Sequence, residues 1–383
     1  MCQNPFTPAF GGKPQHFFGR RSELSLVGDA LDNSLSPHRA LFITGNRGCG
    51  KTALLEQVSE LAIAHKWLAV DVHAEDALMS AVKKLAGGTQ REETRNAQPE
   101  AFGVTLGGVS TTLSTSFTGI DLSDLIQEKL DGLRSPRGIL ITVDEAQKMS
   151  ERDAEGLCTG AQMAMRKGYA VMLVLAGLPE SKEKIATYRG CTFMERAFDI
   201  KLSSLLIDET YDAFRGLLAL STNLVADEEA IDHMARFSLG YPYLMQLIGF
   251  YAVEVAGDCQ KGQWVSVGPG DVAVAEMTAY AAYRENVLKA ALRPVRNGVR
   301  GYLHTMALLL DADGRAETRK IAAALEKEPS QCTMMRQRLI DRRLIVADGR
   351  GFVRFNLPYL GQYLLEEEFA DENATSTPGA WLF

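Results

Sequence analysis

Residues 39–56 read RALFITGNRGCGKTALLE, and this stretch decides the fold of the chain. A short apolar run at 40–44 predicts a β-strand. The eight residues after it, GNRGCGKT at 45–52, match the pattern G-x-x-x-x-G-K-[ST] at every fixed position. The glycines let backbone N–H groups close around a phosphate without a Cβ in the way, and the helix predicted for 51–64 points its N-terminal dipole at the same anion. The stretch therefore predicts a strand, a phosphate-binding loop and a helix.

Each residue of this loop has a predicted role in binding a nucleotide. The Lys51 side chain would reach the β- and γ-phosphates, and the Thr52 hydroxyl would bind Mg²⁺. A glycine-rich turn that binds nothing is the alternative, and the strand–loop–helix context argues against it. The predicted nucleotide-binding residues of the loop are Gly45, Asn46, Arg47, Gly48, Cys49, Gly50, Lys51 and Thr52.

A second apolar run, GILITVDE at 138–145, ends in two acids. Because parallel sheets bind ligands at the carboxyl ends of their strands, these acids are expected beside the phosphate loop. Asp144 is the predicted Mg²⁺ ligand, and Glu145 is predicted to orient the water that attacks the γ-phosphate. Glu145 and Lys51 are thus predicted catalytic residues. Taken alone, the acids fit equally well a strand that ends in solvated carboxylates.

Length and composition limit the classes of protein that fit. The chain has 383 residues, enough for two or three domains, with ordinary globular composition. The net charge of −7 argues against a protein that coats nucleic acid non-specifically over its whole surface. The six cysteines have no metal-binding spacing, and no run of 18 apolar residues is present. We therefore expect reduced thiols, a location in the cytoplasm and no membrane partner.

The order of apolar runs predicts three domains. Short β runs at 40–44, 67–72, 138–144, 169–176 and 198–202 alternate with helices, which predicts an α/β fold with a parallel-sheet P-loop NTPase core over 1–205. Within it, 102–117 fits either a hairpin or a disordered insert. After Leu205 the β signals stop, and helices at 209–220, 227–237, 243–256 and 270–292 predict an all-helical lid over 206–292.

The last part of the chain predicts a winged helix-turn-helix domain over 293–370. Helices are expected at 298–310, 318–325 and 330–341. Two β runs then flank DGRG at 348–351, and a helix follows at 359–369. Residues 371–383 are predicted to form a flexible tail.

The two nucleotide motifs resemble the Walker A and Walker B motifs of AAA+-related P-loop ATPases. The segment Phe18-Gly19-Arg20, with Glu23 after it, is similar to the GR-x-x-E segment of the initiator (origin-recognition) and STAND-like branches. Gly240-Tyr241-Pro242 resembles their G-x-P element, and the resemblance covers about residues 15–290. It implies that Phe18, Gly19, Arg20 and Pro242 border the adenine, and that a C-terminal winged helix is common among such proteins.

The chain departs from these families at two positions. Ala176-Gly177 stands where many AAA+ members have a polar sensor residue, and Tyr243 stands where initiators often have Arg after the G-x-P. Both departures predict slow hydrolysis. Arg196 lies where such ATPases place an arginine finger, which makes it a predicted catalytic residue; a solvated surface arginine is the alternative.

The C-terminal domain carries a charge opposite to that of the rest of the chain. Between Pro294 and Pro358 there are twelve Arg or Lys residues and seven Asp or Glu residues, a balance of +5 that leaves −12 elsewhere. A basic module on an acidic chain is typical of DNA contact. The predicted DNA-binding residues are Arg336 and Arg338 on the recognition helix and Arg350 at the wing tip. A winged helix that binds protein is the alternative.

Taken together, these patterns predict an ATP-binding, slowly ATP-hydrolysing protein in which nucleotide controls DNA binding. The alternative is a STAND-like signalling or scaffold ATPase whose winged helix binds protein. The expected cofactors are ATP and Mg²⁺. The expected partners are ATP or ADP, double-stranded DNA, a protein in the alternative, and further copies of the chain in a nucleotide-dependent homo-oligomer.

Overall fold

The computed structural model describes residues 4–9, 17–33, 35–87, 103–106, 109–112, 121–132, 136–257, 264–295 and 297–375. Contacts divide the chain into two units, and this division differs from the domain boundaries predicted above. The sheet unit comprises Arg20–Thr44 and Lys51–Lys201. The C-terminal unit comprises Met1–Gly19, Gly45–Gly50 and Leu202–Phe383, so the phosphate loop groups with the later part of the chain.

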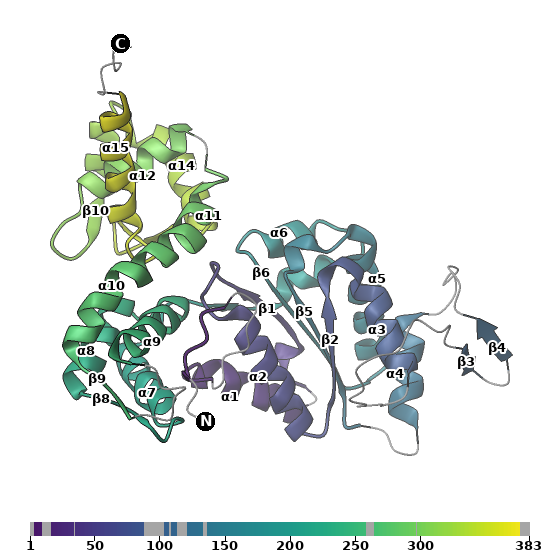
Figure 1. The fold of residues 1–383 in the computed structure, drawn as a ribbon. Coiled ribbons are helices and arrows are strands. Elements are labelled where there is room, and N and C mark those ends of the chain that lie inside the picture. The colour runs from purple at the N-terminus through teal and green to yellow at the C-terminus, as the bar shows by residue number, and fades with distance from the viewer. Residues whose placement is uncertain are drawn as a thin grey trace, which may run out of the picture. The chain divides into compact units, whose positions relative to one another are not determined.

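A five-stranded parallel sheet forms the centre of the sheet unit (Figure 1). Its order is β2-β5-β6-β1-β7, and every neighbouring pair is parallel. The strands are β1 (Ala40–Thr44), β2 (Leu68–His73), β5 (Ile139–Asp144), β6 (Val171–Gly177) and β7 (Phe198–Lys201). This sheet confirms the predicted α/β P-loop NTPase core.

Helices cover both faces of the sheet, as the continuous apolar strands require. On one face lie α1 (Arg21–Asp32) and α2 (Lys51–Ala64); on the other lie α3 (Ala77–Ala86), α4 (Leu122–Asp131) and α5 (Glu151–Arg166) (Figure 1). A hydrophobic core groups strand residues such as Ile141 and Leu173 with Leu125 and Leu157 of α4 and α5. This packing fixes the carboxyl ends of β1 and β5, where the predicted nucleotide site begins.

The hairpin offered as one interpretation of 102–117 is present as two antiparallel strands, β3 (Gly103–Leu106) and β4 (Val109–Thr112). The other residues of that segment lie outside the described part of the chain.

The predicted lid contains its four helices, α7 (Ile207–Leu218), α8 (Glu228–Ser238), α9 (Pro242–Ala256) and α10 (Pro269–Tyr283). The last continues through a π-helical turn, Arg284–Leu288, into α11 (Lys289–Leu292). The expectation of an all-helical segment was wrong, because β8 (Leu224–Ala226) pairs in parallel with β9 (Val265–Val267). Each strand has only three residues, which is too short to show an alternating pattern in the sequence.

The C-terminal module, residues 297–375, has helices and strands close to their predicted positions. They are α12 (Asn297–Leu308), β10 (Arg315–Glu317), α13 (Thr318–Ala324), α14 (Pro329–Asp341), β11 (Ile345–Ala347), β12 (Phe352–Phe355) and α15 (Leu360–Thr375). The added strand β10 makes a three-stranded antiparallel sheet with the order β10-β12-β11. Helix α15 reaches into the segment predicted as a tail, and residues 376–383 lie outside the described part of the chain.

None of the helices in the described ranges is long and apolar enough to cross a membrane.

Candidate nucleotide site

The phosphate loop, Gly45–Gly50, has the tight backbone that its glycines predict. Gly48 and Gly50 have φ values of +79° and +92°, a left-handed conformation that favours glycine. At Gly45 a Cβ would clash with the Cys49 sulfur. The Cys49 N–H donates to the Asn46 carbonyl across the turn. The backbone of the loop is therefore tightly folded, as binding a phosphate through backbone N–H groups requires.

Within the C-terminal unit, the start of α9 contacts this loop directly. The Tyr241 hydroxyl donates to the Arg47 carbonyl, and the Tyr243 N–H donates to the Gly48 carbonyl at 3.1 Å. Burial raises the pKa of Tyr241, so its hydroxyl keeps the proton that it donates at neutral pH. A Cβ at Gly48 would lie 2.7 Å from the Tyr243 Cβ, so glycine is needed for this approach.

Arg343 of the C-terminal module contacts the same loop. The Asn46 side-chain amide donates to the Arg343 carbonyl at 2.8 Å. Arg343 has a left-handed φ of +55°, its carbonyl also accepts from the Asn356 side chain at 2.9 Å, and its guanidinium donates to the Leu202 carbonyl at 3.1 Å. No local pattern predicts this contact, because 297 residues separate the two partners.

In the sheet unit, the two predicted metal ligands lie together. The Thr52 hydroxyl donates to an Asp144 carboxylate oxygen at 2.5 Å, and Lys51, beside Thr52 in the first turn of α2, is 8% exposed. A hydroxyl and a carboxylate are the hard oxygen donors that Mg²⁺ prefers. Among the described residues no group of three or more His, Cys, Asp or Glu side chains could hold a metal. A Mg²⁺ ion here would therefore take its remaining ligands from phosphate and water, as Mg²⁺ sites in nucleotide-binding proteins do.

Glu145 follows Asp144 in an uncommon conformation. Its φ is +53°, and its N–H donates to the Asp144 carboxylate at 2.7 Å. The Glu145 carboxylate accepts a hydrogen bond from the Gln147 amide at 2.8 Å and lies 3.7 Å from the Lys148 ammonium. A left-handed non-glycine residue costs free energy and is concentrated at functional sites. Gln147 is the residue near this site that sequence reasoning missed.

A cavity of about 380 Å³ opens beside these acids in the sheet unit. Its walls come from α2, β2, α3, β5 and the turns that follow β2 and β5, and they include Thr52, His73, Asp144 and Glu145. The cavity therefore gives water and solutes access to the carboxylates.

The residues expected near the adenine lie at two helix starts and one loop. The Phe18 ring packs on Gly216 of α7, where a Cβ would clash with it, and Gly19 has a left-handed φ of +77°. Arg20, 8% exposed, precedes α1 and lies 3.6 Å from the Glu23 carboxylate. Pro242 is the first residue of α9. Their contact with adenine stays a prediction.

Arg196 is exposed at the end of a 3₁₀ turn, η4 (Thr192–Arg196), just before β7. Its role as an arginine finger stays a prediction.

The three predicted DNA-binding arginines differ in exposure. Arg338 of α14 is exposed, and Arg350 is exposed in the turn between β11 and β12. Arg336 is half-buried, one helical turn from the buried residues Cys332 and Leu339. Burial raises the pKa of the nearby Tyr302 to about 12, although the charge of Arg336 acts in the opposite direction. Arg338 and Arg350 are thus the more accessible of the three.

Comparisons with known proteins agree with this architecture. Residues 16–172 match the model of the AAA ATPase domain family, and residues 285–364 match a domain of unknown function, DUF8462. No curated protein matched the sequence of the chain.

Several solved structures are similar over nearly the whole chain. The ORC2 protein of Aeropyrum pernix, determined as ADPNP–ADP complexes, has 16% identity and a TM-score of 0.57, with 96% of this chain and 98% of that chain covered. Cdc6p from Pyrobaculum aerophilum has 12% identity and a TM-score of 0.47, with coverage of 95% and 97%. The A. pernix ORC1 protein, in complex with DNA, has 17% identity and a TM-score of 0.44, with coverage of 94% and 95%.

The ATPase-domain match agrees with the parallel sheet and the phosphate loop, and the similarity to A. pernix ORC2 extends the shared fold to the rest of the chain. Residues 16–172 therefore match an AAA ATPase domain, and the chain as a whole has a fold similar to that of A. pernix ORC2.

Proposed function

We propose that this protein binds ATP with Mg²⁺, hydrolyses it slowly to ADP and phosphate, and uses the bound nucleotide to control the binding of double-stranded DNA. The observation that carries the nucleotide part is the 2.5 Å contact between Thr52 and Asp144, the two side chains expected to share a metal ion. The ADPNP–ADP complexes of A. pernix ORC2, which has a similar fold, support it.

The predicted site residues have separate roles toward the nucleotide. Lys51 binds the β- and γ-phosphates, and Thr52 and Asp144 hold Mg²⁺, which neutralises phosphate charge when bound. Glu145 orients the attacking water. Arg196 acts as an arginine finger in a homo-oligomer that forms with nucleotide. Phe18, Gly19, Arg20 and Pro242 are proposed to border the adenine.

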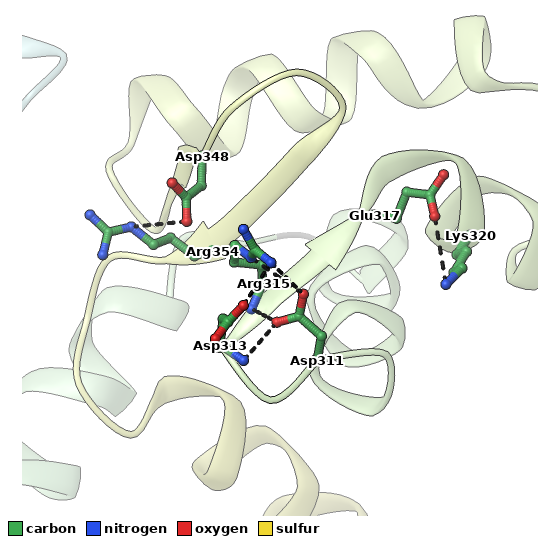
Figure 2. Close-up of polar contacts among 7 residues, drawn as sticks. All are labelled: Asp311, Asp313, Arg315, Glu317, Lys320, Asp348 and Arg354. Carbon is green, nitrogen blue, oxygen red and sulfur yellow. Dashed lines mark hydrogen bonds and ion pairs between the residues drawn. The ribbon is translucent and has the colours of Figure 1, made fainter.

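The DNA part is supported by the +5 charge balance of residues 294–358, which exclude the acidic helix α15, and we propose that the C-terminal module is a winged helix. Four acids of this module pair with only three of its basic side chains, as Figure 2 shows: Asp311 and Asp313 with Arg315, Glu317 with Lys320, and Asp348 with Arg354. The excess positive charge of residues 294–358 therefore rests on other residues. Among these, Arg336 and Arg338 on α14 would read base edges, and Arg350 would contact phosphate.

Arg350→Ala is expected to weaken binding to all DNA duplexes by a similar factor. Loss of one phosphate contact should lower the slope of log affinity against log salt by about one unit. The measurement is the Kd for two duplexes of different sequence across a salt series. Arg315→Gln is the matched control, because Arg315 is already neutralised by two carboxylates at 3.3 and 2.7 Å. Equal slopes for wild type and Arg350→Ala would contradict the proposed role of Arg350.

The second candidate is a signalling or scaffold ATPase whose module binds protein. Met334 favours it, because this apolar side chain is 67% exposed one helical turn from Arg338 on α14. Exposed methionines are common on protein-binding surfaces. A folded protein that does not bind duplex DNA at low salt would favour this candidate over the first.

Nucleotide control is supported by the contacts of the phosphate loop with the C-terminal module. Asn46 lies inside the loop and donates to the Arg343 carbonyl, which Asn356 also holds. If the loop rearranges around phosphates, Asn46 would move and its hydrogen bond to the Arg343 carbonyl would change. The binding of nucleotide would thereby alter the module that contacts DNA.

Asn356→Ala is expected to reduce the effect of ATP on DNA affinity. An effector commonly changes the affinity of a second site fivefold or more, which is a coupling free energy of about 1–3 kcal/mol. In the variant, the ratio of the duplex Kd with ATP to the duplex Kd without ATP should move toward one. Fluorescence titration of labelled duplex measures this ratio. Gln362→Ala is the control, because it removes an amide–carboxylate hydrogen bond, 2.8 Å to Glu366, elsewhere in the same module. A ratio unchanged from a wild-type value above one would contradict this route of control.

A further inference from the structure

The end of β6 lacks a polar side chain of its own, although it lies beside the strand that carries the acids. Ala176 and Gly177 close this strand, and β6 pairs in parallel with β5. A Cβ at Gly177 would lie 2.8 Å from the Ser181 hydroxyl and 3.1 Å from the Gln147 amide oxygen. A larger residue at 177 would therefore compete with Gln147 for the same space.

Gln147 connects the two strand ends with both ends of its amide. It lies in a 3₁₀ turn, η3 (Ala146–Lys148), directly after the acids. Its NH₂ group donates to Oε2 of Glu145 at 2.8 Å, and its oxygen accepts the Leu178 N–H at 3.2 Å. Rotation of the amide by 180° would set its NH₂ group against the Leu178 N–H and its oxygen against the carboxylate. The two contacts therefore fix a single orientation of the amide.

The same amide fixes the Glu145 carboxylate. In the described part of the chain, both polar contacts of the carboxylate, from Gln147 and from Lys148, reach Oε2. Lys148 is the weaker restraint, because its ammonium is 3.7 Å away and also pairs with Glu75 at 3.7 Å. Oε1 is thus the oxygen left to accept a proton from water.

The geometry points to Gln147 as the positioning residue for Glu145. The end of β6, Ala176-Gly177, has no polar side chain that could take this role. This inference rests on the proposed hydrolysis of ATP. The backbone N–H of Leu178, directly after β6, fixes the position of the Gln147 amide. The Gln147 amide in turn orients the Glu145 carboxylate, which binds the attacking water. Gln147 acts through Glu145 and need not touch the nucleotide.

Gln147→Glu tests this role, because it keeps the length of the side chain and the acceptor for Leu178 but removes the donor to Glu145. We expect kcat to fall about 10- to 100-fold, as small misplacements of a catalytic group do, while KM and the Kd for ATP stay unchanged. A purely structural role would instead change KM and the Kd for ATP together with kcat.

Gln57→Glu is the matched control, because Gln57 makes the same kind of bond, 2.8 Å from its amide to the Glu60 carboxylate, further along α2. If Gln147→Glu does not fold, Gln147→Met removes both amide contacts at similar volume, and kcat alone is then compared. Wild-type turnover that both Gln147 variants retain would overturn this inference and leave the proposed hydrolysis standing. A wild type that binds ATP without any turnover would overturn both.

Discussion

Lys51→Ala is expected to abolish the binding of ATP and ADP. The side chain lies buried at the start of α2, directly after the phosphate loop, so its loss removes the positive charge predicted to face the phosphates. In wild type, nucleotide at one hundred times its Kd should raise the free energy of unfolding by about 2.7 kcal/mol. Thermal unfolding with and without Mg²⁺ and nucleotide measures this gain, which the variant should lack.

Lys83→Ala provides the control for this experiment, because Lys83 is an exposed lysine on α3 of the same unit. It should keep the full gain in melting temperature. The proposal of a nucleotide site would not survive a folded wild-type protein whose melting temperature is the same in saturating nucleotide and in buffer.

Glu145→Gln is expected to retain ATP but to lose its hydrolysis. The amide cannot accept a proton from water, and loss of a general base typically lowers the rate about 10²- to 10⁴-fold. The Kd for ATP should stay close to wild type, because Lys51, Thr52 and Asp144 are unchanged. Phosphate release under single-turnover conditions measures the rate, and equilibrium titration measures the affinity.

Glu75→Gln is the control, because this acid shares the Lys148 ammonium with Glu145 at the same distance, 3.7 Å. Wild-type turnover should itself be slow, given the apolar Ala176 and the Tyr243 that replace the residues expected at those positions. Rapid turnover that persists in Glu145→Gln would show that another group handles the water.

The sequence predicts well whatever depends on a continuous local pattern. The five strands of the sheet, the phosphate loop and the paired acids each occupy a run of neighbouring residues with one periodicity or motif. The contact of Thr52 with Asp144 follows from topology, since parallel strands bring their carboxyl ends to one edge.

Other features depend on residues that meet only in the folded chain. Strands β8, β9 and β10 have three residues each, so their pairing partners rather than their own pattern decide their conformation. The role of Gln147 depends on β6 lying beside β5, with glycine at 177. The contact of Asn46 with Arg343 joins parts of the chain that no local pattern connects.

The grouping of the phosphate loop with the C-terminal unit has a consequence for protein engineering. Residues 1–205 look like a self-sufficient ATPase domain in the sequence, yet Tyr241, Tyr243 and Arg343, which bond to the loop, all lie beyond that boundary. A fragment that ends at residue 205 would keep every motif residue from 45 to 145, but it would lose the hydrogen bonds that these three residues make with the loop. Truncated variants and domain swaps of this protein should therefore include the later residues together with the loop.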